Sequence, residues 1–144
     1  MGKLAQGGDI FLLMGDLGTG KTCFIQGIAQ GLGVKEYAFS PSFVIIREYH
    51  GRLPLYHIDF YRLDHIEEFA DLGLEEYFYG KGVCAIEWAE KGLQILPQNN
   101  LLIELNYVPE YETQRVIHLK PEGEHYLKLI KRLQSNLIKE KAWS

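Results

Sequence analysis

The feature that most constrains the fold is a glycine-rich loop, Gly15–Thr22, between an apolar segment and an amphipathic one. The loop reads Gly-Asp-Leu-Gly-Thr-Gly-Lys-Thr and matches the pattern G-x-x-x-x-G-K-[ST] at every fixed position. The apolar run before it, 10–14, is typical of a strand buried on both faces. After the loop, apolar residues recur at helical spacing up to Leu32, and Gly33 follows as a stop signal. A strand, this loop and a helix form the context in which the pattern binds phosphate.

The residue types of the loop explain that chemistry. Glycines adopt positive φ, which lets backbone N–H groups point at phosphate oxygens. The helix that starts near Thr22 directs the positive end of its dipole to the same place. Lys21 brings a positive charge to the β- and γ-phosphates, and the Thr22 hydroxyl can bind Mg²⁺. The loop therefore predicts a site for ATP or GTP.

The other segments predict an α/β fold. Strands are expected at residues 10–14, 43–49, 55–62, 83–86, 101–108 and 114–119. The second and third should form a hairpin, and the last two a late antiparallel pair. Helices are expected at 22–32, at 66–79 with a loosening at Gly73, and at 123–141 with an apolar face of Tyr126, Ile130, Leu133 and Leu137. We predict a single three-layer P-loop NTPase domain over 1–144, with a mixed, mainly parallel sheet and flanking helices.

Composition and charge exclude several other classes of protein. The chain is 47% hydrophobic and 24% charged, which suits a soluble globular protein. It has neither a signal sequence nor an apolar run near the roughly 18 residues of a membrane span, so we expect it in the cytoplasm. The net charge of −4 argues against holding nucleic acid by charge alone. A basic excess after residue 119 fits either a solvated helix face or a partner or RNA contact. Cys23 and Cys84 are expected to be buried and reduced.

A carboxylate follows the apolar residues 83–86. In open α/β sheets, ligands bind at the carboxyl ends of strands, so Glu87 is predicted to lie beside the loop. There it could hold Mg²⁺ through a bound water; the alternative is an acid at the surface end of a strand. Trp88 comes next and either stacks on a nucleotide base or packs in the core.

The segment 57–62 reads His-Ile-Asp-Phe-Tyr-Arg. Strand alternation separates a titratable face from an apolar one, with His57, Asp59 and Tyr61 opposite Tyr56, Ile58 and Phe60. Asp59 could orient or deprotonate an attacking water. The alternative is a solvated outer face with a His57–Asp59 hydrogen bond. Three arginines could neutralise charge in such a reaction, and the sequence does not rank them: Arg47, Arg52 and Arg62.

Together these segments resemble the TsaE (YjeE) family, the ATPase of tRNA threonylcarbamoyladenosine synthesis. The resemblance covers roughly residues 1–119 and rests on the phosphate loop and on Ser40-Pro41-Ser42-Phe43, His57-Ile58-Asp59-Phe60-Tyr61-Arg62-Leu63 and Ile86-Glu87-Trp88. It implies a bacterial ATPase, slow alone, that works with the partners TsaB and TsaD. These proteins support transfer of threonylcarbamoyl to N6 of adenosine 37 in tRNAs that read ANN codons. The chain would meet tRNA only through its partners.

The resemblance also assigns roles to residues. It implies ATP and Mg²⁺ as cofactors, with Asp59, Glu87 and Lys21 as the catalytic residues. The expected metal contacts are Thr22, Glu87 and Ser42, where Ser42 takes the place of a switch threonine in the family. The expected nucleotide contacts are Gly15, Asp16, Leu17, Gly18, Thr19, Gly20, Lys21, Thr22, Cys23 and Trp88.

One departure from the family concerns the N-terminus. The family has an extra strand and helix before the loop, and residues 1–5 resemble the tail of that helix. In the family these residues help to enclose the nucleotide base, so the resemblance does not settle which base this chain selects.

Two other functions are weighed against the ATPase. One is a small P-loop kinase that phosphorylates a metabolite or nucleotide, for which no arginine-rich lid segment is found. The other is an interaction module gated by nucleotide, in which the 40–43 loop would be ordered for a partner.

Overall fold

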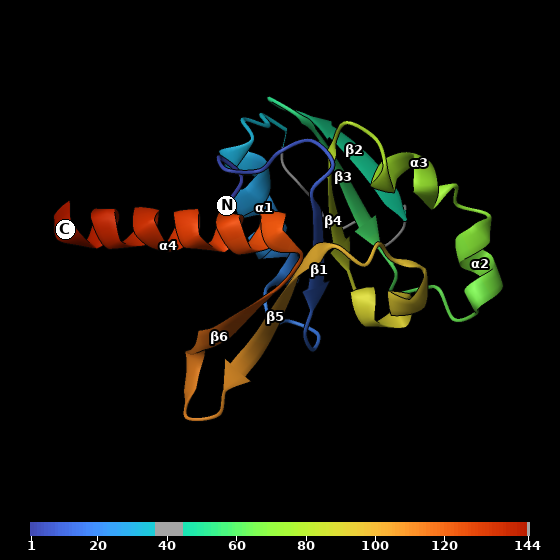
Figure 1. Cartoon of the computed structure of the whole chain (residues 1–144). Helices are drawn as coiled ribbons and strands as arrows, with labels where there is room; N and C mark the ends of the chain where they lie inside the picture. The colour runs from blue at the N-terminus through green and yellow to red at the C-terminus, as the bar shows by residue number, and fades with distance from the viewer. Residues whose placement is uncertain (37–44, 144) are drawn as a thin grey trace.

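The computed structural model describes residues 1–36 and 45–143 and contains a six-stranded mixed sheet (Figure 1). The strands are β1 (Ile10–Met14), β2 (Ile46–His50), β3 (Pro54–Asp59), β4 (Val83–Glu87), β5 (Asn100–Val108) and β6 (Tyr111–Glu122). The helices are α1 (Lys21–Gly31), α2 (Ile66–Ala70), α3 (Leu74–Phe78) and α4 (Glu124–Trp143), with 3-10 turns η1 (Ala89–Lys91) and η2 (Leu93–Ile95). The predicted α/β fold is confirmed.

The strand order is β2-β3-β4-β1-β5-β6. The four central strands are parallel, since β1 pairs with β4 and β5, and β3 pairs with β4. At the two edges, β2 is antiparallel to β3 and β6 is antiparallel to β5, which confirms the predicted hairpin and late pair. The carboxyl ends of β1, β3 and β4 therefore meet at one edge of the sheet, where ligands bind in folds of this kind.

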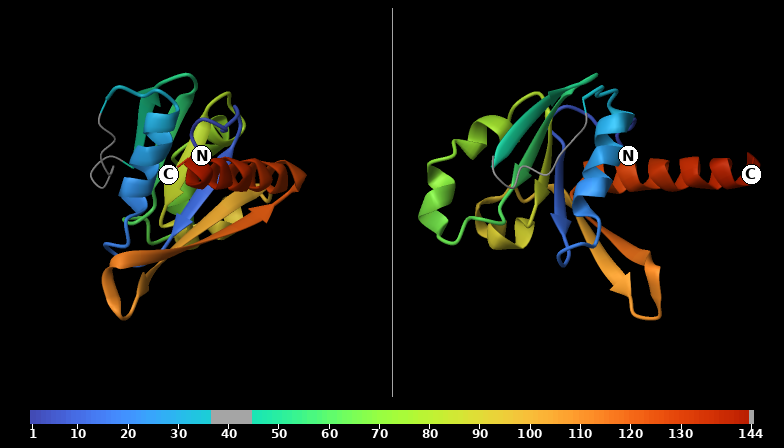
Figure 2. Two further views of the ribbon diagram at one scale, coloured as in Figure 1. Left: turned by 90° about the vertical axis from the view of Figure 1, so that its left-hand side faces the viewer. Right: turned by 180° about the vertical axis from the view of Figure 1, so that it is seen from behind.

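Helices cover both faces of the sheet, which gives three layers (Figure 2). Helix α1 and the first turns of α4 pack on one face against Phe11, Leu13, Leu55, Ala85 and Ile103. Helices α2 and α3 and the 3-10 turns pack on the other face against Ile10, Leu12, Ile58, Cys84 and Ile86. Strand β1 is thus buried on both sides, as its continuous apolar sequence predicts.

Two predicted elements end differently in the structure. The strand predicted to reach Arg62 ends at Asp59, because the Asp59 carboxylate accepts a hydrogen bond from the N–H of Tyr61 at 2.8 Å and the chain turns there. Tyr61 therefore does not share a strand face with His57 and Asp59. The helix predicted over 66–79 is divided into α2 and α3 at Gly73, which has a φ of 62°.

Helix α4 packs on the sheet only through its first turns. Tyr126 and Leu129 are buried, whereas Leu137 on the predicted apolar face is 51% exposed. In Figure 2 the later part of the helix runs out beyond the sheet. No helix in the described ranges is long and apolar enough to cross a membrane.

Candidate nucleotide-binding site

The Gly15–Thr22 loop follows β1 directly and ends in the first turn of α1. Its glycines Gly15, Gly18 and Gly20 have φ values of 151°, 80° and 105°. A Cβ atom at Gly15 would lie 2.5 Å from the backbone oxygen of Leu105, so that position has no room for a side chain. The loop therefore has the left-handed backbone of a phosphate cradle, and the positive end of α1 faces it.

A cavity of about 540 Å³ lies beside this loop. It is lined by Leu17, Gly18, Gly20, Lys21, Thr22, Cys23, Gln26, Asp59, Tyr61, Glu87 and Trp88. Residues from the loop, α1 and the ends of β3 and β4 thus meet around one space. Nine of the predicted site residues line it.

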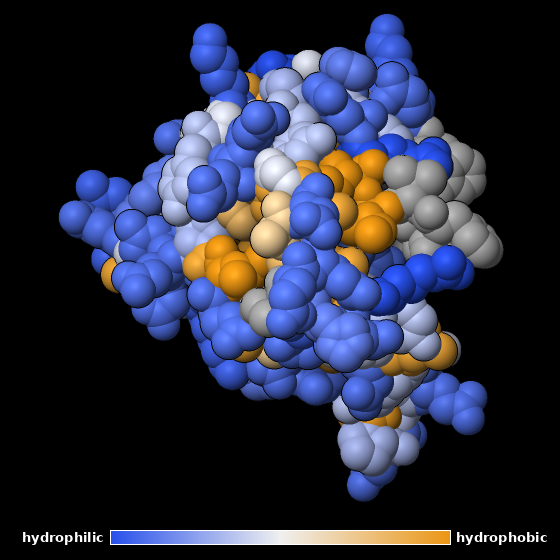
Figure 3. Space-filling view, turned by 90° about the vertical axis from the view of Figure 1, so that its right-hand side faces the viewer, coloured by the Kyte–Doolittle hydropathy of each residue, from blue (hydrophilic) through white to orange (hydrophobic). Residues whose placement is uncertain are grey.

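A second cavity, of about 640 Å³, lies on the α2 and α3 side and is mainly apolar. Its lining is Phe69, Ala70, Gly73, Leu74, Glu75, Glu76, Phe78 and Ile95. Figure 3 views the molecule from this side and shows apolar side chains among hydrophilic ones. The larger volume does not make it the phosphate site, because its charged lining residues are acidic and would repel phosphate.

The amine of Lys21 is folded back onto the loop. It donates hydrogen bonds to the backbone oxygens of Gly15 and Asp16, and it lies 3.9 Å from the centroid of the Trp88 ring. Burial lowers the pKa of Lys21, while nearby acidic groups, first Glu90 and then Glu87, act in the opposite direction. A desolvated cation at this position gains strongly when a phosphate anion binds beside it.

The carboxylate of Glu87 contacts two side chains in the described part of the chain. Its Oε1 accepts a hydrogen bond from the Thr22 hydroxyl at 2.8 Å, and its Oε2 lies 2.6 Å from Nε2 of His57. Glu87 is buried at the end of β4, and its Cα is level with that of Asp59 on β3. The sheet register thus brings both predicted acids to the edge where the loop begins. The partner of His57 is therefore Glu87 on the neighbouring strand. The alternative raised from the sequence, a hydrogen bond between His57 and Asp59, is replaced by this contact.

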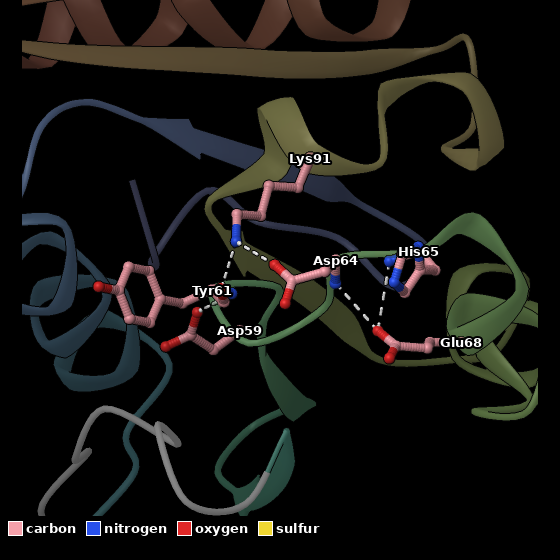
Figure 4. Close-up of polar contacts among 6 residues, drawn as sticks. All are labelled: Asp59, Tyr61, Asp64, His65, Glu68 and Lys91. Carbon is pink, nitrogen blue, oxygen red and sulfur yellow. Dashed lines mark hydrogen bonds and ion pairs between the residues drawn. The ribbon is translucent and has the colours of Figure 1, made fainter.

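The chain after β3 is held by a network of polar contacts (Figure 4). The amine of Lys91 contacts the backbone oxygen of Tyr61 and forms an ion pair with Asp64 at 3.7 Å. The N–H of Asp64 donates to the carboxylate of Glu68 at 2.9 Å, next to the start of α2. These contacts fix the turn that carries Asp59 and Tyr61 into the cavity.

Two features of the site have no signal in the sequence. The hydroxyl of Tyr107, on β5, donates a hydrogen bond to the backbone oxygen of Leu17 at 2.7 Å. Trp88 has a φ of 56° and is the only non-glycine among the described residues with positive φ. Its backbone turns the chain from β4 into η1, and its ring lies 5.0 Å from that of Tyr61. Backbone of this kind is strained for a large residue and is common at functional sites.

Three sequence expectations have different outcomes. The prediction that Cys23 is buried is wrong: Cys23 is exposed at the cavity, whereas Cys84 is buried as predicted. Arg52 donates hydrogen bonds to the backbone oxygens of Gly2 and Ala5, so it anchors the N-terminal segment and does not reach the cavity. Ser42, with the rest of the segment 40–43, lies outside the described residues.

A family model described as "Threonylcarbamoyl adenosine biosynthesis protein TsaE" matches residues 1–117. The chain belongs to the TsaE family. Proteins named "tRNA threonylcarbamoyladenosine biosynthesis protein TsaE" are similar to it in several bacteria. The one from Treponema pallidum is 46% identical over 76% of this chain and 82% of its own length. The one from Bacillus subtilis is 46% identical over 90% of this chain and 80% of its own length.

The fold is also that of a solved TsaE relative. The crystal structure of Bacillus subtilis YdiB is similar, with a TM-score of 0.79 and 41% sequence identity. The similarity covers 94% of this chain and 85% of that one. The family resemblance and the predicted fold class are therefore confirmed together.

Proposed function

We propose that this TsaE-family chain binds ATP with Mg²⁺ and hydrolyses it in support of tRNA threonylcarbamoyladenosine synthesis. The observation that carries the proposal is the 2.8 Å contact between the Thr22 hydroxyl and the Glu87 carboxylate at the mouth of the phosphate loop. Asp59 and Lys21 line the same cavity. A phosphate cradle, two oxygen donors for a cation and a further carboxylate are the parts that nucleotide hydrolysis needs.

The donor chemistry fits Mg²⁺. This ion prefers oxygen ligands, keeps several waters and is commonly held by one or two protein groups together with phosphate oxygens. Thr22 and Glu87 would hold it, directly and through water, and it would neutralise charge on the phosphates. The Lys21 amine would release the carbonyls of Gly15 and Asp16 and bind the β- and γ-phosphates instead.

Asp59 is assigned to the attacking water. Asp59 is 5% exposed and lines the cavity, and its carboxylate is oriented by the N–H of Tyr61. Fixed in this way, the Asp59 carboxylate can accept a hydrogen bond from a water and orient that water toward the γ-phosphate.

Water is favoured over a kinase substrate as the acceptor of the γ-phosphate, because none of the lining residues in the described part of the chain is an arginine. A kinase normally needs such a group at its acceptor side.

We further propose TsaB- and TsaD-type proteins as partners, with tRNA bound through them, in the cytoplasm where tRNA is modified. The family name supports the pathway, and the resemblance of the motifs supports the partners. An interaction module gated by nucleotide is the second candidate, since a nucleotide bound at the Gly15–Thr22 loop could order a binding surface for a partner without being hydrolysed.

The test is ATP turnover with and without purified TsaB and TsaD. We expect slow hydrolysis by the chain alone and a higher rate in the mixture.

Asp59→Asn should reduce turnover about 100-fold or more while nucleotide still binds, in keeping with the usual contribution of a general base. Asp71→Asn, an exposed acid after α2, is the matched control. Normal turnover in Asp59→Asn would remove Asp59 from the mechanism. Transfer of phosphate to an added metabolite faster than hydrolysis would favour the kinase.

A further inference from the structure

His57 is a buried histidine and is not among the residues that line the two cavities described above. Its side chain has no exposed surface, and it lies on β3 between Leu55 and Asp59, on the face that packs toward α1. Its Cα is level with that of Ala85 on β4. The small side chain of Ala85 leaves room for the imidazole to reach diagonally along the sheet to Glu87, two residues further on.

The contact with Glu87 determines which ring nitrogen carries the proton. An ionised carboxylate accepts hydrogen bonds but cannot donate them, so Nε2 of His57 is the donor across the 2.6 Å contact. The other ring nitrogen, Nδ1, is buried and has no hydrogen-bond partner among the described residues. The orientation of the ring is therefore set on one side only, by Glu87.

The two oxygens of Glu87 have different surroundings. Oε2 is directed into the core, toward His57, and Oε1 is directed at the Thr22 hydroxyl. Without a donor at Oε2, the carboxylate would have to turn toward the cavity or bury an oxygen without a partner. His57 thus holds Glu87 in the orientation that presents a single oxygen to the loop.

From this geometry we infer that His57 is a positioning residue for the cation site: it orients Glu87 toward Thr22 and so determines how well the site holds Mg²⁺ with nucleotide. The inference rests on the proposed nucleotide site. His57 itself touches neither ligand. Groups behind a metal ligand of this kind commonly change metal affinity 10- to 100-fold when they are removed.

The test uses two amides that differ in reach. In His57→Gln the side-chain amide nitrogen can take the place of Nε2, whereas in His57→Asn it is one methylene too short. The affinity for ADP is measured by calorimetry, in EDTA and again in excess Mg²⁺. In EDTA both variants should bind within about twofold of the parent chain, since the phosphate loop is unchanged. The strengthening produced by Mg²⁺ should be kept in His57→Gln and reduced about tenfold or more in His57→Asn.

His50→Asn is the matched control, because His50 is an exposed histidine on β2. Equal strengthening by Mg²⁺ in the Gln and Asn variants would overturn the inference, as would loss of ADP binding in EDTA. Thermal unfolding without nucleotide shows whether each variant is folded. If one of the two is unfolded while the other is folded, His57 is a structural residue and the inference also fails. Failure of the proposed function is a separate result: the parent chain itself would bind no ADP or ATP.

Discussion

Tyr107 and Leu17 are 90 positions apart in the sequence, and the hydroxyl of the first donates a hydrogen bond to the backbone oxygen of the second. This contact joins β5 to the outer side of the phosphate loop. A Cβ atom at Gly18 would lie 2.8 Å from the same hydroxyl, so the loop and the tyrosine fit closely. Strand β5 thus supports the loop at Leu17 and Gly18.

Removing this hydroxyl should weaken nucleotide binding. In Tyr107→Phe the loop loses one hydrogen bond, whose usual net value is about 1 kcal/mol, so the Kd for ATP should rise about fivefold. Calorimetric titration measures the change. Tyr111→Phe, on the same hairpin and 54% exposed, should leave the Kd unchanged. Equal affinities in all three proteins would show that the loop keeps its shape without Tyr107.

Nucleotide binding should change the fluorescence of Trp88. The Lys21 amine lies 3.9 Å from the centre of the indole ring, and a bound γ-phosphate would draw it away. In a Trp143→Phe background Trp88 is the single tryptophan, so addition of ATP should change emission from that residue alone. Adding Lys21→Met should abolish the response. A constant spectrum at saturating ATP, with binding confirmed by calorimetry, would mean that Lys21 stays where it is.

Alkaline pH should destabilise the fold through Cys84. Burial raises the pKa of Cys84 to about 12 from an ordinary value of 9.0. Above pH 9 the unfolded chain therefore loses a thiol proton that the folded chain keeps, and stability falls by up to about 1.4 kcal/mol per pH unit. Between pH 8 and 10.5 the parent chain should lose on the order of 2 kcal/mol more than Cys84→Ala.

Urea unfolding at both pH values measures this difference, and the free energy lost between them is compared for each protein. Cys23→Ala removes the exposed thiol and should keep the full loss of the parent chain. If Cys84→Ala loses as much stability as the parent, the titration of this thiol does not contribute.

The contact of α4 with β1 should be worth a measurable part of the stability. The hydroxyl of Tyr126 accepts a hydrogen bond from the N–H of Ile10 at 2.9 Å, and both groups are buried. Tyr126→Phe leaves that amide without an acceptor, which should cost about 1–3 kcal/mol in the free energy of unfolding. Urea unfolding gives the value, and Tyr79→Phe, at an exposed tyrosine, is the control. A cost near zero would indicate that water replaces the hydroxyl.

Local patterns predicted the parts of the site that depend on local structure. The loop, the strand before it and the helix after it form one continuous stretch, so their geometry follows from residues that are neighbours in sequence. Glu87, the last residue of β4, lies beside the loop as predicted, because parallel strands present their carboxyl ends at one edge. The fold class followed from the order of the same elements.

The remaining features depend on contacts between distant segments. Whether His57 meets Asp59 or Glu87 depends on the register of β3 against β4, which neither strand encodes alone. The early end of β3 depends on a side-chain hydrogen bond from Asp59 that alternation does not reveal. The exposure of Cys23 could have been predicted: two residues before the buried Ile25, it lies about 200° around the helix, on the opposite face.

The Cα atoms of Asp59 and Glu87 lie opposite each other on neighbouring strands. This pairing restricts where a member of the family can gain or lose a residue. Side chains alternate along a strand, so deletion of one residue in β3 would carry His57 and Asp59 to the side of α2. A deletion in the turn before Pro54 or near Gly73 leaves the alternation intact. Among natural variants of this chain, we expect insertions and deletions to accumulate in those turns, while the strands that lead to the site keep their number of residues.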